Sequence, residues 1–174
     1  MRWLAIAAAG LAALVDALYL GIVFSQPGGT GGQFLRIPFV ALFIAVLAIA
    51  AALAARASSA RWRSALLGFS AIGLLVMGYF ALFSIGFFLV VAGILALVAA
   101  IRCLVRATGP GALQQTSVGA LVALMCIVLG FTLAERVIRC PSAGVTGGAG
   151  QYLFFGGSYQ YTCRDGVLTL TTGR

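Results

Sequence analysis

The stretch that decides the fold runs from Ala65 to Ile101 and reads "ALLGFSAIGLLVMGYFALFSIGFFLVVAGILALVAAI". Its 37 residues include no charge and no proline. As one helix it would be about 55 Å long, whereas the hydrocarbon core of a bilayer is about 30 Å thick. The stretch must therefore turn once, and "FSIGF" around Ser84 and Gly86 offers a cap and a tight bend. This predicts two antiparallel helices, over residues 65–83 and 85–101.

The rest of the chain contains three more apolar stretches, which predict helices over residues 3–24, 38–55 and 118–134. The composition agrees, because 63% of the 174 residues are hydrophobic and 8% are charged, against about 25% charged residues in a soluble domain. The predicted fold class is an all-α polytopic membrane protein with five transmembrane helices and a small C-terminal antiparallel β meander. Residues 1–139 would form the helical bundle and residues 140–174 the tail.

The arginines predict how the chain is threaded through the membrane. The formal charge is +8, from eleven arginines and three acids, with no lysine. Arg56, Arg61 and Arg63 share one short loop, and Arg102 and Arg106 fall on the same side two helices later. Short, strongly basic loops stay in the cytoplasm. We therefore expect a protein of the cytoplasmic membrane, with a cytoplasmic N-terminus and an extracytoplasmic tail, whose arginines set topology or contact lipid headgroups and not nucleic acid.

The last 35 residues read as a sheet held by a disulfide. We expect three antiparallel strands, at residues 151–155, 158–163 and 167–172. Gly156-Gly157 and Asp165-Gly166 are two-residue hairpin signals between them. Cys140 and Cys163 both lie in the tail, where an oxidising compartment allows a disulfide. Closing a loop of this size stabilises by about 3 to 3.5 kcal/mol on the chain-entropy estimate.

One acid, Asp16, lies in the middle of the first apolar stretch. Ala5, Ala9, Ala12 and Asp16 share one helix face, because residues at i, i+4, i+7 and i+11 align. Comparable faces of small residues, where membrane helices approach closely, are expected on the second helix (Ala41, Ala45, Ala48, Ala52 and Ala55) and the fifth (Gly119, Ala123, Cys126 and Gly130). Asp16 is therefore expected to point into the bundle.

A charge at bilayer depth is costly, so Asp16 needs either a proton or a partner. Arg36 is the expected charged partner. Tyr19, Tyr79, Ser70 and Thr132 are the expected neutral ones. The favoured interpretation is an intramembrane polar latch, Asp16 with Arg36, between helices. A proton or cation site, and a contact to another subunit, stay open as alternatives.

The composition excludes several kinds of site. The chain contains no histidine, lysine or asparagine, which excludes histidine-ligated haem or metal and Schiff-base chemistry on lysine. No metal and no cofactor is expected. The cysteines are spaced too widely for a C-x-x-C redox motif. Cys103 and Cys126 are expected to be reduced thiols, with Cys126 behaving as a small buried hydrophobe.

The resulting hypothesis is a non-enzymatic membrane protein. It would be an accessory or assembly subunit of a larger membrane complex, with the bilayer and other membrane-protein subunits as partners, or a small homo-oligomer. Two alternatives stay open. One is a thiol–disulfide enzyme that exchanges electrons with a membrane quinone, and the other is a small transporter that uses Asp16.

Overall fold

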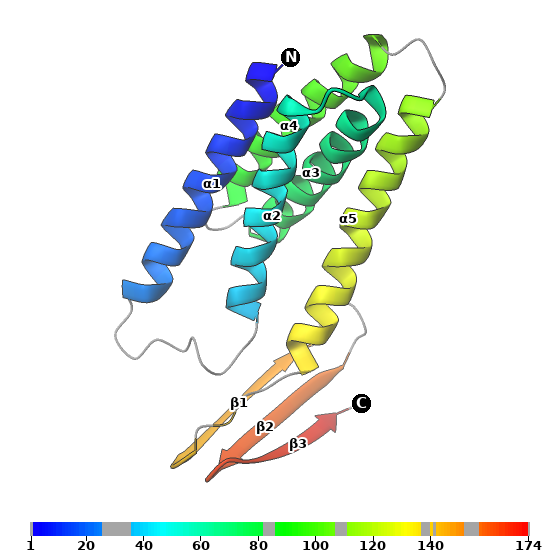
Figure 1. Cartoon of the computed structure of the whole chain (residues 1–174). Helices are drawn as coiled ribbons and strands as arrows, with labels where there is room; N and C mark the ends of the chain where they lie inside the picture. The colour runs from blue at the N-terminus through cyan, green and yellow to red at the C-terminus, as the bar shows by residue number, and fades with distance from the viewer. Residues whose placement is uncertain are drawn as a thin grey trace. The chain divides into compact units, whose positions relative to one another are not determined.

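The computed structural model describes residues 2–25, 36–81, 86–106, 111–136, 140, 142–151 and 157–173 (Figure 1). The elements in chain order are α1 (Arg2–Ser25), α2 (Arg36–Arg56), α3 (Ala60–Phe80), α4 (Gly86–Arg106), α5 (Gly111–Arg136), β1 (Val145–Gln151), β2 (Ser158–Arg164) and β3 (Val167–Gly173). Within these described residues, five helices are long and apolar enough to cross a membrane. This confirms the predicted number of such helices and the small antiparallel sheet.

Three helices extend beyond the predicted bounds by five to seven residues at one polar end. Helix α3 begins at Ala60 instead of residue 65, α4 ends at Arg106 instead of residue 101, and α5 begins at Gly111 instead of residue 118. Hydropathy identifies only the apolar segment of a helix and not the polar turns at its ends. Arginine and glutamine are good helix formers, so the backbone continues as helix past the apolar stretch. The predicted turn at 84–85 lies outside the described residues.

The chain divides into two compact units by its internal packing. One unit comprises residues 1–22 and 41–127, and the other comprises residues 23–40 and 128–174. The first is called here the helical unit, and the second contains the sheet together with the adjoining helix ends. Each unit combines two separate segments of the chain, so this division does not test a boundary at a single point of the sequence. The predicted domain boundary between residues 139 and 140 stays a prediction.

Helix α3 meets three neighbours through three glycines. Gly68, Gly73 and Gly78 are spaced by five residues, so successive glycines are rotated by about 140° around the helix. All three are buried, and each gives space to a different helix. The neighbouring groups belong to Thr116 of α5, Leu47 of α2 and Val90 of α4, respectively. The three glycines thus lie on different sides of α3, and each lets a different neighbouring helix approach it closely (Figure 1).

The contact between α3 and α5 is a contact of two backbones. A Cβ added to Gly68 would collide with the carbonyl oxygen of Thr116, and one added to Gly119 would collide with that of Ala65. Small residues allow such close approach between membrane helices. A side chain adds a further link to α2, because the Ser70 hydroxyl donates a hydrogen bond of 3.1 Å to the carbonyl oxygen of Leu47.

The sheet has the order β1-β2-β3, and both pairs are antiparallel. In β2 the burial alternates, with Tyr159, Tyr161 and Cys163 on the covered face, and this strand spans the predicted residues 158–163. The β2–β3 turn has positive φ at both Asp165 (47°) and Gly166 (82°). Two positive φ values define the type I′ turn that Asp-Gly favours, and the predicted hairpin is confirmed there.

The prediction that the first strand begins at residue 151 is wrong, because strand β1 runs from Val145 to Gln151, where Gln151 pairs with Ser158. The rest of the predicted strand, residues 152–155, and the first residue of the predicted turn at Gly156-Gly157 lie outside the described residues. The glycine-rich sequence "VTGGAGQ" has low intrinsic β propensity. It nevertheless forms a strand, in which Gly148 makes room for the ring of Tyr161 on β2.

Candidate functional site

Positive charge gathers at one end of the helical unit. The six arginines at this end come from the start of α1, the end of α2, the start of α3 and the end of α4: Arg2, Arg56, Arg61, Arg63, Arg102 and Arg106. The chain has three acids, Asp16, Glu135 and Asp165, and none belongs to the segments that form this end. Asp16 lies about 21 Å from Arg2 along α1. The arginine end therefore has no countercharge from these segments.

Two exposed tryptophans accompany these arginines. Trp3 follows Arg2 and is 82% exposed, and Trp62 lies between Arg61 and Arg63 and is 70% exposed. Tryptophan gathers at the headgroup level of membranes, where its amphipathic ring is favoured. The two exposed rings are therefore compatible with a position of the arginine end at the surface of a membrane.

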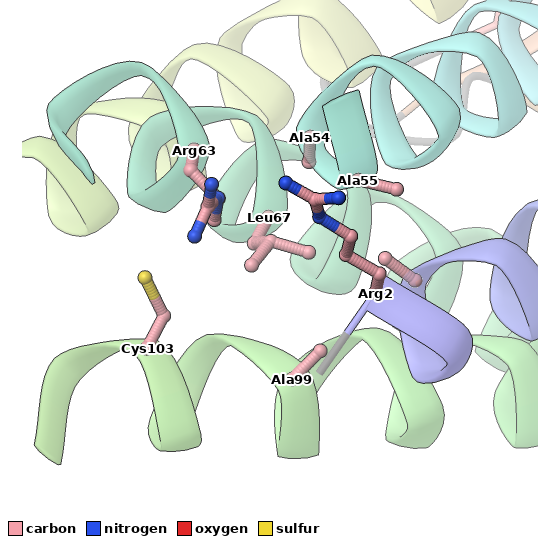
Figure 2. Close-up of a pocket in the computed structure, with 8 residues that line it drawn as sticks. Arg2, Ala54, Ala55, Arg63, Leu67, Ala99 and Cys103 are labelled. Carbon is pink, nitrogen blue, oxygen red and sulfur yellow. The ribbon is translucent and has the colours of Figure 1, made fainter. Parts of the chain in front are cut away.

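A small cavity lies within the arginine end (Figure 2). Arg2 reaches from α1 toward Arg63 and Leu67 of α3, and the thiol of Cys103 on α4 points into the same space. The cavity measures about 20 Å³, which suits one water molecule and no organic ligand. Arg63 donates a hydrogen bond to the carbonyl oxygen of Ala57, while its buried Nε has no hydrogen-bond partner among the described residues.

A larger groove shares Arg2 with this cavity and opens between α1 and α2. Its volume is about 530 Å³, within the range of about 300 to 1,000 Å³ that is common for ligand pockets. Arg2 and Arg56 lie at its polar end, and the remaining lining residues are Ile6, Ala9, Gly10, Ala52 and Ala55. The groove therefore joins two guanidinium groups to an apolar channel.

Asp16 is buried on α1, on the same face as Ala5, Ala9 and Ala12, as predicted. Its Oδ1 has no hydrogen-bond partner in the part of the chain that the structure describes. The side chain of Arg36 lies outside the described residues, so the Asp16–Arg36 pair stays a prediction.

Two of the four expected neutral partners of Asp16 make hydrogen bonds elsewhere. Ser70 donates to the carbonyl oxygen of Leu47, and Thr132 donates to that of Val128 in its own helix, over 2.7 Å. Tyr79 is 72% exposed. Tyr19, three residues after Asp16, remains on the adjacent turn.

The cysteines divide into a disulfide and two free thiols. Cys140 and Cys163 form the predicted disulfide, with their Cα atoms 5.4 Å apart. Cys103 is buried and Cys126 is exposed, and both are free. The prediction that Cys126 lies on the packing face of α5 is wrong. That face follows Gly119, Ala123 and Ile127 at steps of four residues, and Cys126 lies one residue, or about 100°, away from it.

The sheet presents apolar residues on an open edge. In the antiparallel register Leu168 pairs with Cys163 and Leu170 pairs with Tyr161, so both leucines share the face of the buried β2 residues. Yet Leu168 is 38% exposed and Leu170 is 42% exposed. Because β3 is an edge strand of the described sheet, this face is covered at its centre and open at its rim.

Sequence reasoning missed the groove and the glycine contacts of α3. The groove could have been found from the spacing of Arg2, Ile6 and Gly10, which lie along one side of α1.

Comparison of the chain with protein-family models, with curated proteins and with solved structures finds no match. What the protein can do therefore follows from its own groups. These are an arginine end with a groove, a buried carboxyl and a disulfide-linked sheet with an open apolar edge.

Proposed function

We propose that this protein is a non-enzymatic integral membrane protein that acts as an accessory or assembly subunit of a larger membrane complex, or as a small homo-oligomer. The observation that supports this most is the open rim of the sheet. Leu168 and Leu170 are exposed beside the buried Tyr161, on strand β3. Exposed apolar residues on an edge strand are typical of a surface that another chain covers.

The chemistry of an edge strand supports docking by pairing. The outer side of β3 faces no further strand in the described sheet, so its N–H and C=O groups can bond to an added strand. An added strand would also cover Leu168 and Leu170. Docking would then combine hydrogen bonds along the edge with burial of two leucine side chains.

The arginines support the orientation that we propose for this assembly. The arginine end would face the cytoplasm, in accord with the positive-inside rule. Five crossings would then place the sheet outside the cytoplasmic membrane. The Cys140–Cys163 disulfide fits this placement, because disulfides persist in oxidising compartments. The sheet would thus be displayed toward extracytoplasmic partners.

The test uses two neighbouring residues of β3 that face opposite sides. Leu170 pairs with Tyr161 on the apolar face, whereas Thr171 pairs with Gln160 on the polar face. The protein is extracted in mild detergent, and its native mass is measured against the 17.9 kDa of one chain. We expect a larger species that Leu170→Lys dissociates and that Thr171→Lys preserves. A wild-type protein that is monomeric under these conditions contradicts the proposal.

A further inference from the structure

We propose that the groove between α1 and α2 binds one anionic phospholipid. The headgroup phosphate would bond to Arg2 and Arg56, and one acyl chain would lie along Ile6, Gly10 and Ala52. The inference rests on insertion of the helices in a membrane and not on the partner of the sheet. The groove offers two positively charged arginines and an open volume, and no acidic residue lines it.

The charge of the site calls for an anion. Arg2 and Arg56 are both exposed residues at the rim of the groove, and Arg63 reaches the adjoining cavity that Arg2 also lines. The chain supplies no acid in the segments that form this end. A phosphate between two guanidinium groups accepts charge-assisted hydrogen bonds from both. It would also reduce the repulsion between them, which a zwitterionic headgroup does less well.

The depth of the groove suits a lipid better than a free ion. From Arg2 to Gly10 the groove follows α1 for about 12 Å at about 1.5 Å per residue. Trp3 and Trp62 mark the headgroup level at the arginine end. The apolar part of the groove therefore begins at the headgroups and continues into the hydrocarbon region. A free anion would use only the arginine rim, whereas a phospholipid uses the whole length.

Gly10 keeps the apolar part of the groove open. A Cβ added at Gly10 meets no atom within 4 Å, so a larger side chain there begins in open space. Gly10→Leu would fill the groove and leave the fold intact. Gly21 on the same helix is equally open and does not line the groove. Gly21→Leu is therefore a matched control for helix propensity and added apolar surface.

The test measures lipid binding to the full-length protein by native mass spectrometry in detergent. The probes are dioleoyl phosphatidylglycerol, dioleoyl phosphatidylcholine and inorganic phosphate. We expect phosphatidylglycerol to bind more tightly than phosphatidylcholine. Arg2→Gln and Arg56→Gln should each weaken the binding of phosphatidylglycerol about fivefold, which corresponds to about 1 kcal/mol per basic residue near a membrane surface. Gly10→Leu should weaken the binding of both lipids.

Two controls decide whether the groove is the site. Arg61 is exposed at the same end of the helical unit but lines neither the groove nor the cavity. Arg61→Gln and Gly21→Leu should leave both affinities unchanged. The proposal is overturned if Arg61→Gln weakens binding as much as Arg2→Gln, because attraction would then be diffuse. It is equally overturned if inorganic phosphate displaces phosphatidylglycerol, if both lipids bind equally, or if Gly10→Leu has no effect.

Discussion

Gly119 in the helical unit and Gly148 in the sheet make room for different kinds of neighbour. Gly119 on α5 lies against the carbonyl oxygen of Ala65, which belongs to the backbone of α3. Gly148 on β1 lies against the ring of Tyr161, and the atoms nearest to an added Cβ are at the far end of that side chain. A ring can rotate away from a new methyl group, but a helix backbone moves only with its whole helix.

The difference indicates how each region is held together. In the helical unit, small residues let neighbouring helices approach closely, and the Ser70 hydroxyl adds a hydrogen bond to the carbonyl oxygen of Leu47. A three-stranded sheet needs a hydrophobic face or packing against a helix for independent stability. This sheet is held by the Cys140–Cys163 bond and by the hydrogen bond from the Gly144 amide to Asp165 Oδ1 at 3.2 Å.

The largest effect is expected from removal of the disulfide. Cys140→Ser opens a loop between positions 23 residues apart, at a cost of about 3.5 kcal/mol on the chain-entropy estimate. Hydrogen exchange at the β2 and β3 amides should accelerate, while exchange in α3 and α4 should stay unchanged. Cys126→Ser removes a free, exposed thiol and serves as the control. Unchanged protection of β2 in Cys140→Ser would show that the sheet does not depend on the bond.

The next effect is expected from filling a backbone contact. A valine at position 119 would place its Cβ where the Ala65 carbonyl oxygen lies. We expect Gly119→Val to destabilise the helical unit by about 1 to 3 kcal/mol, the usual range for overpacking. The melting temperature in detergent measures this loss. Gly10→Val makes the same chemical change in open space on α1 and should leave the melting temperature nearly unchanged. Equal losses in the two variants would contradict the role given to the close contact.

A smaller effect is expected at Asp16, which tests whether polar contacts, in addition to close packing, stabilise the helical unit. Asp16 is buried, and its Oδ1 has no partner in the described part of the chain. If Asp16 is a neutral latch, Asp16→Asn keeps its shape and hydrogen-bonding groups, and the melting temperature should stay near wild type. Asp16→Leu should lose about 0.5 to 2 kcal/mol, as polar contacts between membrane helices do.

Two other outcomes would change the role of Asp16. If Asp16→Asn destabilises the protein and Arg36→Gln partly restores it, Arg36 is the partner, because removing both charges leaves neither unpaired. If Asp16→Asn leaves stability intact but abolishes a proton flux measured in liposomes, the latch interpretation is wrong and a transport role takes its place.

The predictable features of the fold are those that local patterns determine. The uncharged length of residues 65–101 requires two helices, and the i, i+4, i+7 spacing puts Asp16 on the alanine face. Alternation along β2 and the Asp165-Gly166 pair identify a hairpin. In each case a period or a turn signal decides the structure without knowledge of any distant residue.

The features that escaped prediction depend on which neighbour a residue meets. Gly68, Gly73 and Gly78 share no face, and they become meaningful only because three different helices pack on α3. Strand β1 has poor intrinsic propensity and forms against Tyr161 of β2. The burial of Cys126 was mispredicted because a step of four residues instead of three rotates the packing face of α5 away from it.

The smallest effect, and the sharpest test of the comparison, is expected at Gly148. Gly148→Val gains strand propensity, worth up to about 1 kcal/mol, but its Cβ would lie 2.8 Å from the Tyr161 ring, which must turn away. These effects oppose each other, so the change in stability of the sheet should stay within about 0.5 kcal/mol. Ala149→Val at the adjacent exposed position gains propensity on the opposite face without meeting the ring. The difference between the two variants, measured as hydrogen exchange in β1 and β2, gives the cost of moving Tyr161. If Gly148→Val costs as much as Gly119→Val, the ring is as immovable as the helix backbone, and the distinction between the two regions is wrong.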